Sequence, residues 1–245
     1  MHVAPPTDNK LLAILAAENL AQVIPQLEHI DLPRGIWLGE YGKPIEHVYF
    51  LTDGIGSALL TSPEGHKAEA GVFGCDGYIP SSAVSGVEYN IYDIRMQIEG
   101  SGYRVPYEQF RQLMESSRGF SKVMIRAIEA FSVQLGYTAL SNAVHDTNVR
   151  LARWLLMCHD RVKGDELPLT HDFIAMMLAV RRPSVTTALH VLEGNRFIYA
   201  ERGRITMRDR EALEEFASDA YGRPEAEWRR LMADFSGKEL QISKG

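Results

Sequence analysis

Residues 169–206 read LTHDFIAMMLAVRRPSVTTALHVLEGNRFIYAERGRIT and predict two short helices joined by a tight turn, followed by a small hairpin. Thr170 is placed to cap the first helix through its hydroxyl, and the apolar residues that follow recur at three- and four-residue spacing. A break at residues 179–182 leads into a second helix, whose apolar positions follow an i, i+3, i+4, i+7 pattern: Val185, Ala188, Leu189 and Leu192. One face of this second helix is therefore expected to be buried.

The opposite face of the second helix carries small, polar or basic side chains: Arg182, Thr186, Thr187 and His190. By itself this pattern is also typical of a solvated amphipathic helix pair. The continuation favours another interpretation, because two strand-like runs flank a turn at Gly203, with an arginine on either side (Arg202 and Arg204). Helix, turn, helix and basic hairpin in this order predict a winged helix-turn-helix that reads the major groove of double-stranded DNA.

The charge of the chain is unevenly distributed. The 245 residues carry a formal net charge of −6, which argues against a generally basic nucleic-acid coat. Residues 168–210 nevertheless hold seven arginines and four acidic residues, a net charge of +3, so the remainder of the chain carries −9. This uneven distribution predicts one positively charged surface that can bind the phosphates of a nucleic acid.

Other features of the composition exclude several classes of protein. Two cysteines, Cys75 and Cys158, imply no disulfide framework and fit a reducing cytoplasm. The sequence does not begin with a secretory pattern, and no apolar run approaches the roughly 18 residues needed to span a bilayer. The histidines and cysteines show no metal-ligand spacing, so we expect no metal and no cofactor. We therefore predict a cytoplasmic protein that has no membrane partner and is not an enzyme.

Four parts are expected along the chain. Residues 8–118 change from a helical stretch to short apolar runs divided by turn signals, which predicts an antiparallel β-roll acting as a sensor or effector domain. Asp53-Gly54, between two of these runs, is a hairpin signal. A dimerisation helix and hinge follow at residues 119–145, the winged helix-turn-helix at residues 146–220, and a tail of open role at residues 221–245. The fold class is therefore α+β.

A heptad-like seam marks the long helix: Met124, Ile128, Phe131, Leu135, Thr138 and Asn142. Its steps of four and three are typical of helices that pair with each other, although packing of the helix on the roll would produce the same spacing. The seam is narrow, and a polar Asn142 within it is a common device for fixing register. We therefore expect the chain to form a homodimer through this helix.

The order of these parts resembles the CRP/FNR family of bacterial transcription regulators. The resemblance extends from about residue 11 to residue 216 and is strongest at DTNVRLARWLL (146–156) and at residues 169–198. HVYFLTDGIGSALLTSPEG (47–65) is similar in layout to the family's hairpin with an acidic turn. The resemblance implies a homodimer that places one recognition helix in each of two successive major grooves, with RNA polymerase as a further partner.

The outward face and the resemblance together imply DNA contacts at nine residues: Thr170, Arg181, Arg182, Ser184, Thr186, Thr187, His190, Arg202 and Arg204. Arg182 is the strongest candidate for reading a base, because a guanidinium can bind guanine O6 and N7 together. Thr187 stands where the family often has a longer side chain, and its methyl group suits a thymine. Thr170, Arg181 and Ser184 are candidates for phosphate contacts, as are the two arginines of the hairpin.

The sensor half departs from the members of the family that bind cyclic nucleotides. Those members hold the ribose with a Gly-Glu pair and the cyclic phosphate with an Arg-Ser pair. The first location here reads Gly74-Cys75-Asp76-Gly77, and the second falls at residues 89–92, which contain no arginine or serine. A desolvated cyclic phosphate needs a paired cation or several donors. We therefore do not expect cyclic AMP as an effector, and the sequence does not identify another.

Two alternatives stay open at the level of the sequence. One is a ligand-binding or enzymatic β-barrel protein with a helical tail, although barrel enzymes usually show clustered His and Glu ligands that this roll lacks. The other is a regulator of the same family that responds to cyclic AMP despite the missing residues.

Overall fold

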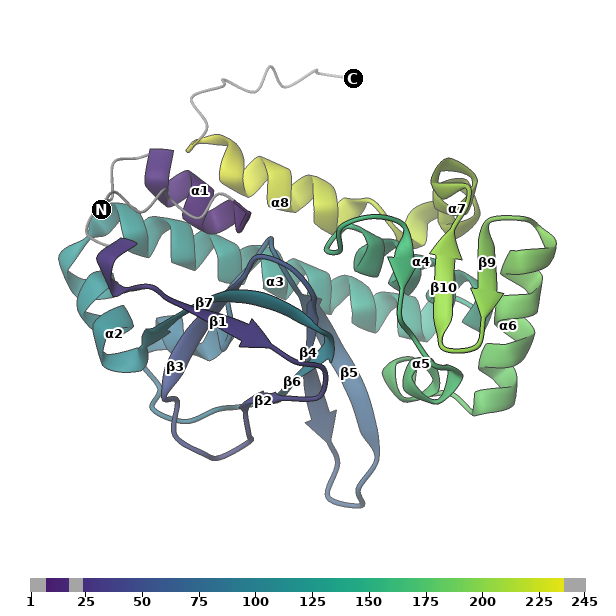
Figure 1. Ribbon diagram of the computed structural model, residues 1–245, viewed down its shortest axis with the longest axis horizontal. Coiled ribbons are helices and arrows are strands. Elements are labelled where there is room, and N and C mark those ends of the chain that lie inside the picture. Colours follow the sequence, from purple (N-terminus) through teal and green to yellow (C-terminus); the bar gives the residue numbers. More distant parts are fainter. Residues whose placement is uncertain (1–7, 18–23, 236–245) are drawn as a thin grey trace.

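The computed structural model describes residues 8–17 and 24–235 of the chain. Figure 1 shows a β-roll, a long helix that runs beside it, and a C-terminal region of helices with a small sheet. A last helix, α8, returns along the long helix. The predicted α+β architecture of a roll, a long helix and a winged helix-turn-helix is confirmed.

Two antiparallel sheets build the roll, one with the strand order β1-β7-β3 and the other with the order β2-β6-β4-β5. The strands are β1 (Glu28–Leu32), β2 (Trp37–Gly39), β3 (His47–Leu51), β4 (Ile55–Thr61), β5 (Lys67–Phe73), β6 (Asp93–Ile98) and β7 (Gly100–Pro106). Leu51 from one sheet and Ile94 and Met96 from the other share a buried cluster with no exposed surface. The two sheets therefore enclose a common apolar interior.

The Asp53-Gly54 turn does not close a hairpin, contrary to the expectation from the sequence. Strand β3 pairs with β7, and β4 pairs with β5 and β6, so this turn carries the chain from one sheet to the other. Gly54 has a φ of +82°, and a Cβ added there would lie 2.8 Å from the carbonyl oxygens of Ile98 and Glu99. The turn residues are thus those of a tight turn, but they do not determine which strands pair.

Three helices cover the roll: α1 (Lys10–Ala17), α2 (Tyr107–Ser116) and α3 (Arg118–Val144). Short 3-10 turns lie at Ile24–Gln26 (η1) and Ser81–Ser85 (η2). The boundary between α2 and α3 is Ser117, whose hydroxyl accepts a hydrogen bond from the N–H of Phe120 at 3.3 Å. Phe120 is fully buried in a core shared with Phe110 and Met124, which fixes α3 against the roll.

The C-terminal region is a winged helix-turn-helix. Its elements are α4 (Thr147–His159), β8 (Glu166–Leu167), α5 (His171–Met177), α6 (Arg182–Gly194), β9 (Ile198–Glu201), β10 (Arg204–Met207), α7 (Arg210–Ala217) and η3 (Ser218–Ala220). The three strands form an antiparallel sheet of order β8-β10-β9. Asp146 caps α4, because its carboxylate accepts hydrogen bonds from the N–H groups of Asn148 and Val149 at 2.8 and 3.0 Å. This cap separates α4 from α3.

One hydrophobic core joins the roll to the C-terminal region. Val72 of β5 and Leu155 of α4 are both fully buried in it. Within this contact the carboxylate of Glu69 accepts a hydrogen bond from Ser57 Oγ and another from Trp154 Nε1, the latter at 2.8 Å. The helix-turn-helix is therefore packed against the roll through a shared core and is not connected to it by the chain alone.

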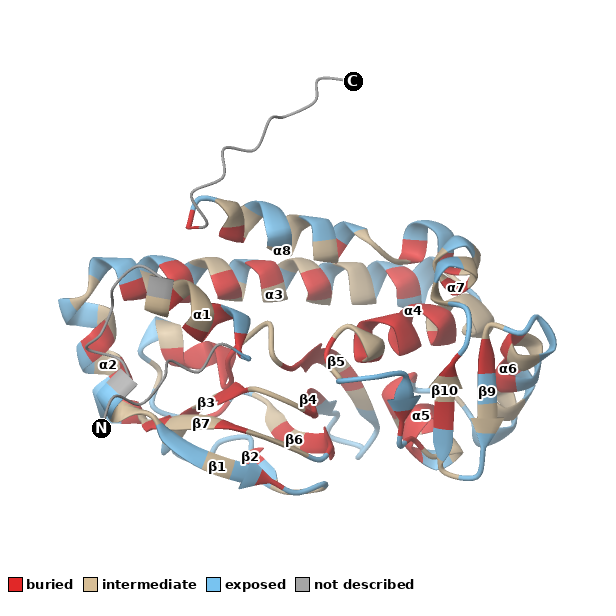
Figure 2. Ribbon diagram, turned by 45° about the horizontal axis from the view of Figure 1, so that its top comes forward, coloured by how far each residue is buried: buried red, intermediate tan, exposed pale blue. Residues whose placement is uncertain are grey.

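Helix α8 (Arg223–Ala233) packs along α3, and Figure 2 shows α3 lying between α8 and the roll. Arg126 of α3 donates a hydrogen bond to the carbonyl of Leu231 at 2.9 Å and pairs with Asp234 at 2.7 Å. Met232 is buried in the same core as Met124. The described part of the tail thus belongs to the folded body and covers part of the α3 surface.

Candidate nucleic-acid interface

The turn between α5 and α6 brings the two helices together within four residues, 178–181. The turn begins one residue earlier than the sequence pattern indicates. Ala179 has a φ of +50°, in the left-handed region, and the N–H of Val180 donates a hydrogen bond to the carbonyl of Ala175 at 3.0 Å. These features close the turn tightly, so α6 leaves it at a fixed angle to α5.

The first turns of both helices are well defined. Thr170 caps α5 as predicted, because its hydroxyl accepts a hydrogen bond from the N–H of Phe173 at 3.3 Å. Arg181 occupies the N-cap position of α6 without a capping bond from its side chain, and Pro183 follows in the first turn. Proline suits this position because its missing N–H would have no partner in the helix. The positive end of the α6 dipole is therefore not neutralised by a capping carboxylate.

The face of α6 turned away from the core is open to solvent. The predicted core positions are buried: Val185, Ala188, Leu189 and Leu192. On the opposite face three side chains are exposed (Arg182, Thr187 and His190) and two are half-buried (Ser184 and Thr186). The Arg182 side chain is 64% exposed and lies 3.4 Å from a carboxylate oxygen of Asp172. An ion pair between such exposed groups is weak, so Arg182 can exchange Asp172 for another acceptor.

The two threonines of this face are already hydrogen-bonded within the protein. Thr187 Oγ1 donates to the carbonyl of Pro183 at 3.1 Å. Thr186 Oγ1 lies 3.1 Å from His171 Nδ1 of α5. With its hydroxyl satisfied, Thr187 offers its methyl group for contact with a ligand.

The two arginines of the wing differ in their partners. Strands β9 and β10 pair around the predicted turn, where Gly203 has a φ of +79°. Arg204 pairs with Glu201 and, at 3.4 Å, with Glu166 of β8. Arg202 is exposed and makes no ion pair with any residue in the described ranges. Arg202 is therefore the wing cation that is available to bind an anion without first leaving a carboxylate.

Three of the six α3 residues predicted for dimerisation pack against their own chain. The expectation that Met124 lies in the dimer contact is wrong, because Met124 has no exposed surface and packs in the core beneath α8. Phe131 and Leu135 lie against Gly71 of β5, where an added Cβ would lie 3.0 and 2.9 Å from their side-chain carbons. The other three positions range from half-buried to exposed: Ile128, Thr138 and Asn142. Packing on the roll thus accounts for much of the heptad spacing.

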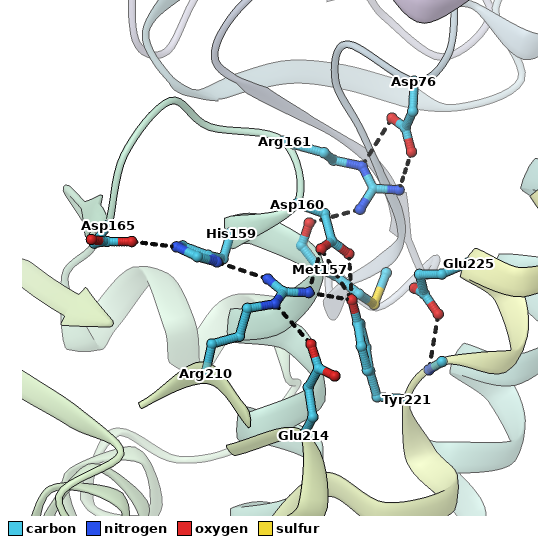
Figure 3. Close-up of polar contacts among 11 residues, drawn as sticks. Asp76, Met157, His159, Asp160, Arg161, Asp165, Arg210, Glu214, Tyr221 and Glu225 are labelled. Atoms are coloured by element: carbon cyan, nitrogen blue, oxygen red, sulfur yellow. Dashed lines mark hydrogen bonds and ion pairs between the residues drawn. The ribbon is translucent and has the colours of Figure 1, made fainter. Parts of the chain in front are cut away.

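A network of ion pairs and hydrogen bonds joins the roll, the end of α4, α7 and the segment before α8 (Figure 3). Arg161 donates to both carboxylate oxygens of Asp76, at 3.1 and 2.6 Å. Asp160 accepts from Arg210 at 2.6 Å and from the hydroxyl of Tyr221 at 2.8 Å. We call these five residues the junction network. Its partners lie 50 to 85 residues apart in the chain, so no local sequence pattern indicates it.

Two members of the junction network, Arg161 and Tyr221, have pKa values shifted by their surroundings. Burial alone would lower the pKa of Arg161, but Asp76, Asp160 and Glu225 raise it above its usual value. Burial, together with the Asp160 carboxylate, raises the pKa of Tyr221 far above its ordinary range, so this phenol stays neutral. Near neutral pH Arg161 therefore stays a cation and Tyr221 stays a neutral phenol, and both act as structural members of the network.

The described residues were also compared with the requirements of metal sites, membrane-spanning helices and reactive thiols. Within residues 8–17 and 24–235, no three His, Cys, Asp or Glu side chains lie close enough to hold a metal ion. None of the helices in those ranges has the length and apolar content to cross a membrane. Burial raises the pKa of both Cys75 and Cys158, which disfavours a reactive thiolate at either position.

Comparisons with known proteins agree with this geometry. Residues 149–216 match the family described as the Crp-like helix-turn-helix domain. No curated protein matches the chain. Three solved structures have the same fold at low sequence identity. TTHB099, a CRP-family transcriptional regulator from Thermus thermophilus, is 18% identical with a TM-score of 0.66, over 80% of this chain and 98% of that chain.

The other two structures give similar values. FixK2 from Bradyrhizobium japonicum is 16% identical with a TM-score of 0.61, over 80% of this chain and 99% of that chain. CLP from Xanthomonas campestris, named as a c-di-GMP-responsive global regulator, is 16% identical with a TM-score of 0.59, over 78% and 99% of the two chains. The chain therefore contains a Crp-like helix-turn-helix domain. As a whole it has the fold of the CRP/FNR transcription regulators, which confirms the resemblance at this level.

Proposed function

We propose that the protein is a homodimeric transcription regulator that binds double-stranded DNA sequence-specifically and is not an enzyme. The observation that carries this proposal is the open outer face of α6, which lies at one end of the molecule away from the roll (Figure 1). A helix that is buried on one face and carries arginine, threonine and histidine on the other fits the major groove.

The exposure and hydrogen bonding of each side chain support distinct roles. Arg182 reads guanine through O6 and N7, and the methyl group of Thr187 contacts a thymine. His190 is exposed further along the same face of α6, and Thr186 is half-buried beside it. Four of the remaining five residues bind phosphates and position the helix without reading sequence: Thr170, Arg181, Ser184 and Arg202. Arg204 joins them only if it leaves its two carboxylate partners.

We place the dimer contact on a stripe of α3 that is open to solvent, next to the predicted seam. Small exposed residues recur there at steps of four, three and four: Ser132, Gly136, Ala139 and Ala143. Large apolar residues lie beside them, with Ile125, Leu140 and Val144 exposed by 54%, 50% and 62%. This heptad-like spacing supports close pairing of two α3 helices. Such a dimer would present two α6 helices to half-sites roughly 34–36 Å apart.

The proposal includes further partners and a location. A regulator of this kind acts in the cytoplasm, where it meets its DNA, and passes its effect to RNA polymerase. The hydrophobic core shared by the roll and α5 supports a signal that acts at the roll and moves the helix-turn-helix. Binding to a two-fold symmetric site is the expected consequence of the dimer.

The test selects genomic fragments bound by the purified protein and measures binding to them by gel shift. Arg182→Ala is expected to weaken binding by about 1–3 kcal/mol and to relax the preference at one base pair of each half-site. Arg223→Ala, at an exposed arginine on α8, is the matched control and should bind like the wild type. Unchanged affinity and base preference in Arg182→Ala would contradict the assignment of α6, and asymmetric sites would contradict the dimer.

A further inference from the structure

A cavity of about 630 Å³ lies where the roll, α3, α7 and α8 meet. Its volume is within the range of pockets that take small organic ligands. Ten of its 22 lining residues lie beyond residue 159: two directly follow α4, and the others lie in α7, in α8 and in the segment before α8. The cavity therefore belongs to the junction between the roll and the C-terminal region, and α8 supplies one of its walls.

The wall of the cavity contains both aromatic and small apolar side chains. Phe131 and Ala130 contribute from α3, Val72 from β5, and Trp228 from α8. The indole of Trp228 is held in place because its Nε1 donates a hydrogen bond to the carbonyl of Asp76 at 2.8 Å. Rings of Phe and Trp favour a flat aromatic partner, which they contact over its face or edge.

Most of the charged groups in the wall are already occupied by one another. Arg161 is bound to Asp76 and also donates to the carbonyl of Met157 at 2.7 Å. Arg210 is bound to Asp160 and, at 2.7 Å, to Glu214. A ligand anion would have to displace a carboxylate to reach the buried guanidinium of Arg161 or the partly buried one of Arg210, which is costly.

Glu225 is likewise engaged within the protein. Its carboxylate accepts a hydrogen bond from the N–H of Gly222 at 3.0 Å. Burial raises the pKa of Glu225, which favours the neutral form relative to an exposed carboxyl group.

Two cations of the wall have no such partner. Lys10 and Arg229 are exposed, and neither makes an ion pair with any residue that the structure describes. Lys10 Nζ lies 5.5 Å from the centre of the Trp228 ring, so the lysine is located beside the aromatic wall. The two exposed charges of the cavity wall that have no ion-pair partner among the described residues are therefore both positive.

We propose that this cavity binds a small aromatic monocarboxylic acid. Its ring lies against Phe131 and Trp228, and its carboxylate meets Lys10 and Arg229 at the exposed edge. The role of this acid as the signal for DNA binding rests on the proposed function, whereas the binding itself does not. Because the cavity wall includes both the roll and the C-terminal region, the bound acid biases how the two are held together.

The first experiment measures binding in the absence of DNA. The full-length protein is titrated with 1-naphthoate and with its uncharged analogue 1-naphthamide by isothermal titration calorimetry. Naphthoate is expected to bind at least about fivefold more tightly than the amide, as for a charge contact near the surface. Lys10→Glu and Arg229→Glu should each weaken naphthoate binding by a similar factor. Arg223→Glu, on the same helix but outside the cavity, should leave it unchanged, and the melting temperatures confirm that all variants fold.

Several outcomes overturn the proposal. Absence of naphthoate binding at millimolar concentration excludes the site, and binding that ignores both charge reversals places the ligand elsewhere. Equal affinity for the amide excludes an acid as the ligand class. Cyclic AMP that competes with naphthoate and binds more tightly shows that a cyclic nucleotide is the ligand instead.

The second experiment repeats the gel shift with and without naphthoate. A change in DNA affinity that is lost in Arg229→Glu supports the acid as the signal. If the protein binds DNA with the same affinity with and without bound naphthoate, the acid is not the signal, although the ligand site itself is not contradicted. Absence of any DNA binding contradicts the proposed function and not the ligand site.

Discussion

The recognition face of α6 and the junction network use the same chemical groups in opposite surroundings. Arg182 is 64% exposed and has one carboxylate neighbour, Asp172, at 3.4 Å. The side chain of Arg161 is 6% exposed and holds both oxygens of Asp76, at 2.6 and 3.1 Å. Both arginines are paired with an aspartate, yet only the first can exchange its partner for a ligand.

Burial explains the difference between these two pairs. In water an ion pair gains little because solvent already stabilises both charges. Inside the protein each charge has lost its water, so breaking the pair leaves the other charge uncompensated. We therefore expect exposed arginines of this protein to govern binding, and buried ones to govern stability.

The largest effect is expected at Arg161. Arg161→Met keeps much of the apolar stem but leaves Asp76 largely buried without its partner. The free energy of unfolding should fall by about 3–5 kcal/mol, measured by urea denaturation. The double variant Arg161→Met, Asp76→Asn removes the uncompensated charge and should recover part of the loss. A loss below about 1 kcal/mol in the single variant would show that the network does not support the fold.

The next largest effect is expected from Glu69, a buried carboxyl group without an ion-pair partner, and concerns the dependence of stability on pH. Burial raises the pKa of Glu69 to about 7, while hydrogen bonds from Ser57 and Trp154 and the nearby Arg153 favour its ionised form. The unfolded chain ionises this group near its usual value of 4.5. As the pH rises from 4.5 to 7 the unfolded state loses the proton first, so the folded state loses about 3 kcal/mol of stability in this window.

Glu69→Gln isolates this contribution, because glutamine does not titrate. The variant should lack that part of the decline, so its stability relative to the wild type should increase between pH 5 and pH 7.5. Urea denaturation at both pH values measures the difference. Parallel pH profiles for the two proteins would contradict the raised pKa of Glu69.

The two exposed arginines of the wing test whether exposed cations govern DNA binding. Arg202→Ala should weaken binding to all DNA sequences alike and lower the slope of log affinity against log salt by about one. Arg204→Ala should change the slope less, because Arg204 is already held by Glu201 and Glu166. Gel shifts at several salt concentrations measure both slopes. A larger change for Arg204 than for Arg202 would reverse the assignment of the wing.

The parts of the molecule that sequence could predict are those set by local patterns. Apolar spacing in α6 placed Val185 and Leu192 in the core, and Thr170 capped the helix that its position indicated. Each of these depends on residues within two turns of one another, so the chain itself carries the information. The fold class and the order of its regions follow from such signals.

What could not be predicted depends on contacts between distant segments. The Asp53-Gly54 turn has the composition of a hairpin, but only tertiary pairing decides that it links two sheets. The spacing of Met124 in α3 fits both a dimer seam and a buried core, and α8 lies over the core that contains it. The junction network likewise depends on α7 and on Tyr221 reaching the end of α4.

The smallest effect is expected at Lys163, two residues from Arg161. Lys163 pairs with Asp8 at 3.2 Å, a distance similar to those in the junction network, but the two side chains are 67% and 61% exposed. Lys163→Met should therefore change the free energy of unfolding by no more than about 0.5 kcal/mol. Urea denaturation of Lys163→Met and Arg161→Met in the same buffer measures both losses. Because methionine is the new residue in both variants, the comparison isolates a buried cation from an exposed one in the same segment. Similar losses in the two variants would show that the position in the chain, and not burial, determines what an ion pair contributes here.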